Sequence, residues 1–334
     1  MHSIQRLVRF FCDRIRSIRK ERIVIDMNHP LANLYGRAKQ TLSTIGIALW
    51  IYLLVQLCVS LLLGLGLGSG VALFPELTFS YFDMMNFFNA IALLVVTPLS
   101  GGLATWFVSD SLRLSYRKQW SLRFRKRDIV HGFCVVLLCS FVSGLLINGL
   151  SLLLPAPIEQ PDFGYSANAL SNALLFVSVA LVGPVVEEVF FRGTILRATA
   201  PYGRLFALGF SSFCFAMMHL NIAQGVPAFF MGFVLGWFYL KSNSLVVPVA
   251  IHVLNNTLAF LAMDESLAWI ASIVILLAAC YGVVYLALHA RQIGAELDEA
   301  QGDPHFLTLV CTNPWLIAFF IVFVLASLGT LVTL

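Results

Sequence analysis

The chain has 334 residues, of which 59% are hydrophobic and 11% are charged, and its formal net charge is +4. An ordinary soluble domain carries about 25% charged residues. So few charges cannot cover a water-facing surface, which excludes a soluble globular protein and favours one whose outer surface contacts lipid.

The cysteines indicate no crosslinked or metal-bound scaffold. There are seven of them, no two form a C-x-x-C pair, and most lie within apolar runs. This pattern favours small apolar side chains in packed helices over a disulfide framework or a zinc site.

Residues 1–40 form a basic segment with nine of the 21 Lys and Arg residues. A long basic stretch ahead of the first apolar run is unlike a cleaved signal peptide. Residues 3–24 alternate cations with apolar residues at near-helical spacing, which fits either an amphipathic helix on the inner leaflet or a solvated tail. We expect residues 1–40 to be cytoplasmic and residues 41–334 to form the transmembrane domain.

The rest of the chain is divided into apolar runs of about the length needed to cross a bilayer. This pattern predicts an all-α, polytopic transmembrane helical bundle of about eight or nine spans. The runs lie at about 42–66, 85–109, 129–154, 169–191, 205–222, 226–240, 244–263, 267–290 and 314–333.

The charges between the runs predict the orientation. Seven further cations lie in residues 111–127, and a cytoplasmic N-terminus with nine crossings puts them inside together with residues 1–40. The charged residues of the predicted outer loops are then all acids: Glu76, Asp83, Glu159, Asp162, Asp264 and Glu265. Because the 111–127 cluster joins two spans, we interpret it as a contact with lipid headgroups rather than with nucleic acid.

Three charged residues lie in the fourth apolar run, near its inner end: Glu187, Glu188 and Arg192. Charges at such depth cost several kcal/mol unless they are paired or hydrated, so function is the default hypothesis. Glu188 and Arg192 are four residues apart and can pair on one helix face. Glu187 is rotated by about 100° from Glu188, which leaves it free to face a cavity. The alternative is a charge cluster at the interface with Arg192 extended towards water.

Two later runs each carry polar residues at four-residue spacing. Phe215-x-x-x-His219 lies near the end of the fifth run, and His252-x-x-x-Asn256 lies within the seventh. A lone histidine in a membrane helix is more often a packing residue than a catalyst. Glutamate, histidine and asparagine from three helices, however, suffice for water activation and oxyanion stabilisation.

These residues together resemble a known family. Glu187-Glu188-x-x-x-Arg192, Phe215-x-x-x-His219 and His252-x-x-x-Asn256 fit, in order, the three motifs of the glutamic intramembrane proteases of the CAAX-protease and bacteriocin-processing (CPBP) family, which includes the type II CAAX prenyl endopeptidases. The resemblance implies a catalytic core at about 169–262.

By this resemblance, Glu187 is the general base that activates water, and His219 orients or shares that proton. His252 and Asn256 stabilise the oxyanion, while Glu188, Arg192 and Phe215 support the motifs. The expected reaction is peptide-bond hydrolysis without a covalent acyl-enzyme, in the cytoplasmic half of the bilayer. The expected substrate is a peptide or a lipidated C-terminal peptide, with membrane lipids as further partners and no nucleic acid.

Alternatives remain open on the sequence alone. One glutamate and two histidines are also ligands that zinc accepts, although the H-E-x-x-H pattern is absent, so we expect no metal and no other cofactor. An ion-coupled transporter or a catalytically silent regulator or immunity protein would also place polar groups here.

The expected depth of His219 in the membrane conflicts with its assignment to the same site as Glu187. If the fourth and fifth runs form antiparallel helices, Glu187 and His219 differ in depth by about 8 Å at 1.5 Å per residue. A kink at Pro184, or a fifth helix that tilts or begins outside the membrane, would bring the two side chains together; otherwise His219 is misassigned or the span boundaries are wrong.

Overall fold

The protein is described by a computed structural model in which every regular element of the described part is a helix, so the predicted all-α fold is confirmed. The amphipathic helix considered for residues 3–24 lies outside the described residues. The expected boundary at residue 40 falls inside α2 (Pro30–Leu73). The described residues are 30–73, 81–116, 119–154, 158, 165–166, 168–300, 302–303 and 305–332.

Six helical segments in this described part are long and apolar enough to cross a membrane, or seven if one bent pair counts as a span. Each of the nine predicted runs lies on a helix, but the runs at 205–222 and 244–263 form the shorter helices α8 (Arg204–Met217) and α10 (Val246–Leu261). The chain is therefore a multi-pass integral membrane protein. The long segments are α2, α3 (Tyr81–Leu112), α4 (Lys126–Ser151), the broken helix at 169–202, α9 (Ile222–Ser242) and α11 (Ala268–Glu299).

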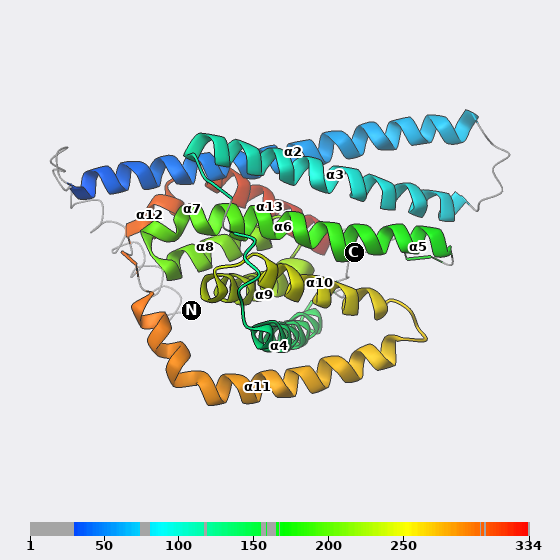
Figure 1. Ribbon diagram of the computed structural model, residues 1–334. Helices are drawn as coiled ribbons and strands as arrows, with labels where there is room; N and C mark the ends of the chain where they lie inside the picture. The colour runs from blue at the N-terminus through cyan, green and yellow to red at the C-terminus, as the bar shows by residue number, and fades with distance from the viewer. Residues whose placement is uncertain are drawn as a thin grey trace.

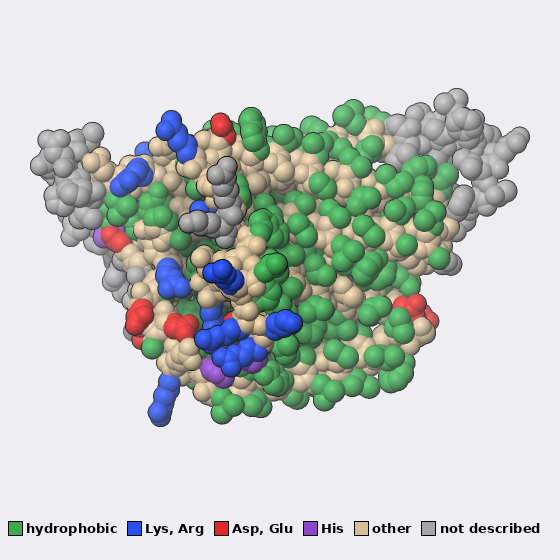
Figure 2. Space-filling view, viewed as in Figure 1, with side chains coloured by type: hydrophobic (Ala, Val, Ile, Leu, Met, Phe, Trp, Pro, Cys, Tyr) green, Lys and Arg blue, Asp and Glu red, His purple; other side chains and the backbone are tan. Residues whose placement is uncertain are grey.

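The bent pair lies at the C-terminal end, where α12 (His305–Cys311) and α13 (Pro314–Val332) meet at 66°. In Figure 1, α2 and α3 lie side by side along one edge of the bundle, and α11 runs along the opposite edge. The helices that carry the three motifs lie between these edges. Figure 2 shows Lys and Arg side chains gathered towards one end of the helices, with a mostly hydrophobic surface beyond them.

The helix that carries the first motif is not a continuous α-helix. It consists of α5 (Ala169–Phe176), a π-helical turn η1 (Val177–Val182), α6 (Gly183–Phe190) and a second π-helical turn η2 (Phe191–Leu196). The chain then continues through α7 (Arg197–Thr199) and η3 (Ala200–Tyr202). Wide turns of this kind are rare and concentrate at functional sites.

Pro184 is tolerated because of this break. It lies in the first turn of α6, just after η1, and the first turn is the part of a helix where proline, which has no N–H to donate, is best tolerated. Next to Pro184 the helix changes from π-helical to α-helical winding, which alters the direction in which the following side chains project.

The contact between α4 and α11 requires a glycine. A Cβ atom at Gly282 would lie 2.8 Å from the backbone oxygen of Cys134, which cannot move as a flexible side chain can. Small residues allow this close approach of helices in membranes.

Gly282→Ala is therefore expected to lower the free energy of unfolding by about 1–3 kcal/mol, the usual cost of overpacking. Thermal unfolding in detergent micelles measures the change. Gly294→Ala on the same helix is the matched control, because no atom lies within 4 Å of its added Cβ. Equal thermal stabilities of the two variants would contradict the packing argument.

Candidate active site

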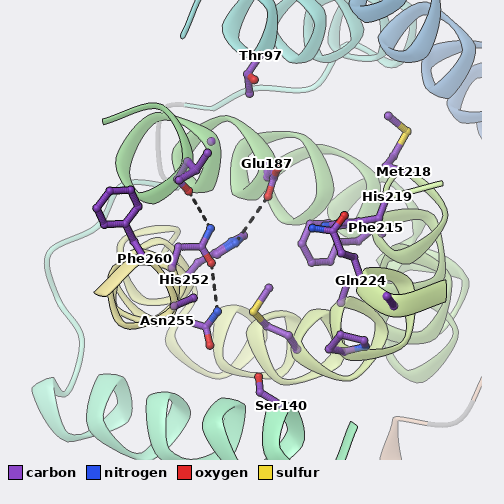
Figure 3. A pocket seen from close by; sticks show the side chains of 18 of the residues that line it. Thr97, Ser140, Glu187, Phe215, Met218, His219, Gln224, His252, Asn255 and Phe260 are labelled. Atoms are coloured by element: carbon purple, nitrogen blue, oxygen red, sulfur yellow. Dashed lines mark hydrogen bonds and ion pairs between the residues drawn. The ribbon is translucent and has the colours of Figure 1, made fainter. Parts of the chain in front are cut away.

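A cavity of about 580 Å³ lies among the motif-bearing helices. Its lining includes all four side chains to which the sequence assigns chemistry: Glu187, His219, His252 and Asn256. Figure 3 shows Glu187 and His252 facing one another from α6 and α10, with His219 to one side near the end of α8. Helices α6 and α10 and the turn after α8 thus bring these groups to one cavity.

Glu188 and Arg192 form a fully buried pair behind the cavity wall. Arg192 Nη1 lies 2.7 Å from Glu188 Oε1, so the structure contains the pair that the four-residue spacing predicts. Arg192 Nη2 donates to the Gly232 carbonyl oxygen at 3.0 Å, and its guanidinium lies 4.7 Å from the centre of the Phe215 ring. The guanidinium is therefore enclosed by a carboxylate, a carbonyl and an aromatic face.

Gly232 on α9 makes this enclosure possible. A Cβ atom there would lie 3.1 Å from Arg192 Nη2 and 3.2 Å from the Phe215 ring. Because α9 approaches so closely, its Gly232 carbonyl can accept a hydrogen bond from the guanidinium, and Phe215 can pack against the guanidinium.

His252 is held by the same buried pair, a contact that the sequence did not predict. Its Nδ1 lies 2.9 Å from Glu188 Oε1, and because a carboxylate oxygen accepts, Nδ1 carries the hydrogen. Its Nε2 lies 3.6 Å from Glu187 Oε2. Glu188 thus fixes the orientation and tautomer of the ring that faces Glu187. No sequence signal connects two residues 64 positions apart.

Glu187 is the carboxylate that reaches the cavity. Its side chain is 26% exposed, whereas that of Glu188 is completely buried. The rotation of about one quarter-turn between adjacent helical residues separates their roles: one carboxylate faces the cavity, and its neighbour is fixed in the protein interior.

His219 lies in the turn after α8 rather than inside a long helix. The fifth run was expected to extend to residue 222, but α8 ends at Met217. His219 Nδ1 donates to the Phe215 carbonyl oxygen at 3.0 Å, and the two rings meet edge to face. The expected depth mismatch with Glu187 does not keep the two residues apart, because both line one cavity.

Asn256 is oriented by the first π-helical turn. Its Nδ2 donates to the Val179 carbonyl oxygen at 2.8 Å, and its Oδ1 accepts from Asn255 Nδ2 at 3.1 Å. Val179 lies in η1, where wide winding leaves carbonyl groups available to side chains. One N–H of the Asn256 amide remains for a further acceptor.

The remaining cavity wall contains polar residues that motif analysis missed. Tyr52 and Gln56 come from α2, and Ser140 and Ser143 come from α4. All four lie within predicted apolar runs. Polar side chains are unusual there, and this signal could have identified the four residues from the sequence.

Comparisons with known proteins match the part of the chain that contains the three motifs. Residues 169–258 match the Rce1-like family of type II CAAX prenyl endopeptidases. The match supports the CPBP family, which the three motifs resemble. A curated relative, "Putative membrane peptidase YdiL" of Bacillus subtilis (strain 168), is 28% identical over 93 residues, which cover 28% of this chain and 38% of the relative. No solved structure matches the chain.

A residue outside the matched range 169–258 forms hydrogen bonds to three parts of that range. Gln119, buried in the segment between α3 and α4, donates from Nε2 to the Gly193 carbonyl oxygen in η2 at 3.2 Å. Its Oε1 accepts from the Tyr239 hydroxyl at 3.3 Å, and its backbone oxygen accepts from the Leu245 N–H at 2.7 Å. One side chain and its backbone thus connect the first-motif helix to α9 and to the start of α10.

Gln119→Ala is expected to lower the free energy of unfolding by about 1–3 kcal/mol, because the Gly193 carbonyl and the Tyr239 hydroxyl lose buried partners. Thermal unfolding in detergent measures the loss. Leu122→Ala is the control, since Leu122 lies in the same segment and is highly exposed. An unchanged midpoint for Gln119→Ala would show that the bridge contributes nothing.

Proposed function

We propose that the chain is an intramembrane endopeptidase that hydrolyses a peptide bond with water activated by Glu187. The observation that carries the proposal is a partly exposed carboxylate, in a cavity between membrane helices, 3.6 Å from an oriented imidazole nitrogen. The Rce1-like match and the peptidase-named relative support the same class of reaction.

In this proposal Glu187 accepts a proton from water, and the resulting hydroxide attacks the carbonyl carbon of the peptide bond. The carbonyl electrons move to oxygen, and donors from His252 and Asn256 stabilise the tetrahedral oxyanion. The C–N bond then breaks, and the proton held by Glu187 passes to the leaving nitrogen. His219 helps to orient the attacking water.

The charge balance around His252 supports its part in this mechanism. Because Nδ1 already donates to Glu188, the ring has an N–H at Nε2 only when it is protonated. Two carboxylates and one guanidinium surround it, so one proton on Nε2 makes the group of four side chains neutral. A neutral group is the least costly arrangement in a poorly hydrated site.

The proposed mechanism requires no metal ion. Glu188, the carboxylate beside Glu187, is engaged by both Arg192 and His252, and His219 Nδ1 is bound to a backbone carbonyl. The proposed chemistry uses only the proton-accepting and proton-donating groups of the chain.

The proposed site lies in the cytoplasmic half of the bilayer. Glu187 lies ten residues before Arg197, or about 15 Å along a helix. Lys and Arg side chains gather towards one end of the helices (Figure 2). The positive-inside rule assigns that side to the cytoplasm. Substrates are then peptides that reach the membrane from that side, including lipidated C-terminal peptides of the kind that the name of the family indicates.

Purified full-length protein in lipid nanodiscs, incubated with a mixture of apolar peptides, tests the proposal by mass spectrometry of the products. We expect internal cleavage that persists in EDTA and phenanthroline. Loss of cleavage with chelators and recovery with zinc would overturn the metal-free step. No cleavage, together with Glu187-dependent proton uptake into vesicles, would replace hydrolysis with transport.

A further inference from the structure

Gln224, in the first turn of α9, presents a side-chain amide to the cavity. Figure 3 shows it on the same side of the cavity as His219 and on the opposite side from His252. Apart from Gln224 and His219, the residues of the stretch 215–231 that line the cavity are all apolar. This side of the cavity therefore has few groups with which to bind a polar ligand.

His219 offers this side an acceptor rather than a donor. Its Nδ1 donates to the Phe215 carbonyl oxygen at 3.0 Å, and a neutral imidazole has only one N–H. Its Nε2 therefore has a lone pair and no hydrogen for a ligand. Among the side chains of 215–231 that line the cavity, the Gln224 amide is the one left to donate a hydrogen bond.

Asn221 determines which way round the Gln224 amide lies. Asn221 Oδ1 accepts from the backbone N–H of Gln224 at 2.8 Å, so Nδ2 is the donor atom of the Asn221 amide. Nδ2 donates to the His219 carbonyl oxygen at 2.7 Å and to Gln224 Oε1 at 2.9 Å. Because Oε1 is taken and no described residue accepts from Gln224 Nε2, both hydrogens of Nε2 remain for a ligand.

The main chain of an extended peptide has the acceptor that this donor needs. Successive carbonyl groups of an extended chain point in alternate directions. When the oxygen of the scissile carbonyl faces His252, the oxygen of an adjacent carbonyl faces the other side of the cavity, where Gln224 lies (Figure 3). A carbonyl group that leaves water for a poorly hydrated cavity loses free energy unless it finds a new donor.

We propose that Gln224 Nε2 donates a hydrogen bond to a main-chain carbonyl oxygen of the substrate, adjacent to the scissile carbonyl, and so fixes the register in which a peptide lies beside Glu187. The inference rests on the proposed hydrolysis at Glu187 and adds a substrate-binding residue to it. Every peptide has such a carbonyl, so the contact fixes position and is independent of the substrate's side chains.

Replacing the amide tests the contact, with the apolar peptide that the parent chain cleaves fastest as the probe. We expect Gln224→Met to raise KM by about three- to tenfold and to change kcat by less than about twofold, because one hydrogen bond made before the chemical step is lost. The thermal midpoint is expected to stay unchanged, since Asn221 Nδ2 retains the His219 carbonyl oxygen.

Two further variants complete this comparison. Gln224→Glu keeps an oxygen that can accept from Asn221 Nδ2 and replaces the NH₂ group, so its KM is also expected to rise. Gln292→Met removes an exposed amide from α11, bonded to Glu296, and is the matched control with an unchanged KM. A KM for Gln224→Met equal to that of the parent chain would overturn the inference.

A thioamide scan of the same peptide distinguishes a substrate contact from a structural role. Replacing one C=O group by C=S weakens that acceptor with little change in the shape of the chain. We expect a C=S group at one position next to the scissile bond to raise KM for the parent chain by about threefold or more, and to have no further effect in Gln224→Met. Equal penalties in the two proteins at every position would overturn the inference.

Binding measured in the Glu187→Gln background separates this inference from hydrolysis, because that variant binds peptide without consuming it. The probe is a fluorescently labelled apolar peptide titrated with protein in nanodiscs. Weaker binding after Gln224→Met, with no cleavage by the parent chain, would overturn hydrolysis and retain the contact. Cleavage by the parent chain, with binding that Gln224→Met leaves unchanged, would overturn the contact and retain hydrolysis. Absence of both binding and cleavage would overturn both.

Discussion

Glu187→Gln is expected to reduce peptide hydrolysis by about 10²–10⁴-fold, the range that a positioned general base contributes. The amide has nearly the same shape as the carboxylate but cannot accept a proton from water. Cleavage rates measured in nanodiscs at saturating peptide provide the comparison.

The thermal stability of this variant is expected to stay close to that of the parent chain. Glu187 is partly exposed to the cavity, and its nearest imidazole nitrogen lies at 3.6 Å, beyond a normal hydrogen bond. The matched control is Glu265→Gln, an exposed acid in the turn between α10 and α11, which is expected to leave hydrolysis unchanged. Hydrolysis by Glu187→Gln at the parent rate would remove Glu187 from the mechanism.

The sequence predicted those parts of the site that depend on local spacing. Four residues separate Glu188 from Arg192, and helical geometry alone brings them together. Adjacent residues of a helix point in directions about 100° apart, so Glu187 and Glu188 were expected to face different surroundings. Apolar runs likewise located the six long apolar helices of the described part, because lipid contact requires long apolar stretches, whereas α12 lies outside every predicted run.

The sequence did not predict contacts between distant segments. The hydrogen bonds from His252 to Glu188 and from Gln119 to Gly193 join residues that are 64 and 74 positions apart in the sequence, so helical spacing does not predict them. The two π-helical turns were also missed, since their side chains look like those of an ordinary apolar helix. Length was misjudged for α8, where His219 proved to lie beyond the helix end.

Arg192→Met is expected to destabilise the fold by about 3–5 kcal/mol, because it leaves the Glu188 carboxylate buried without its cation. Glu188→Met is expected to cost a similar amount by leaving the guanidinium unpaired. Neither side chain has any exposed surface, so water cannot compensate either loss without a change in packing. Unfolding in detergent, followed by the far-UV signal, measures both variants.

The double variant Glu188→Met/Arg192→Met completes a double-mutant cycle with the two single variants and decides whether the pair is energetically coupled. Replacing both members of a buried ion pair by apolar side chains of similar volume is often neutral, so the double variant is expected to be more stable than either single one. If instead the two losses add, the pair is not energetically coupled.

Recovered stability should not bring back hydrolysis. Glu188 also accepts from His252 Nδ1, and a methionine at that position leaves the imidazole without the bond that fixes its tautomer and aims Nε2 at Glu187. The double variant is therefore expected to fold and to remain inactive, because the pair orients His252 through an oxygen that packing alone cannot replace. Activity in a folded double variant would mean that His252 is positioned by its apolar neighbours instead.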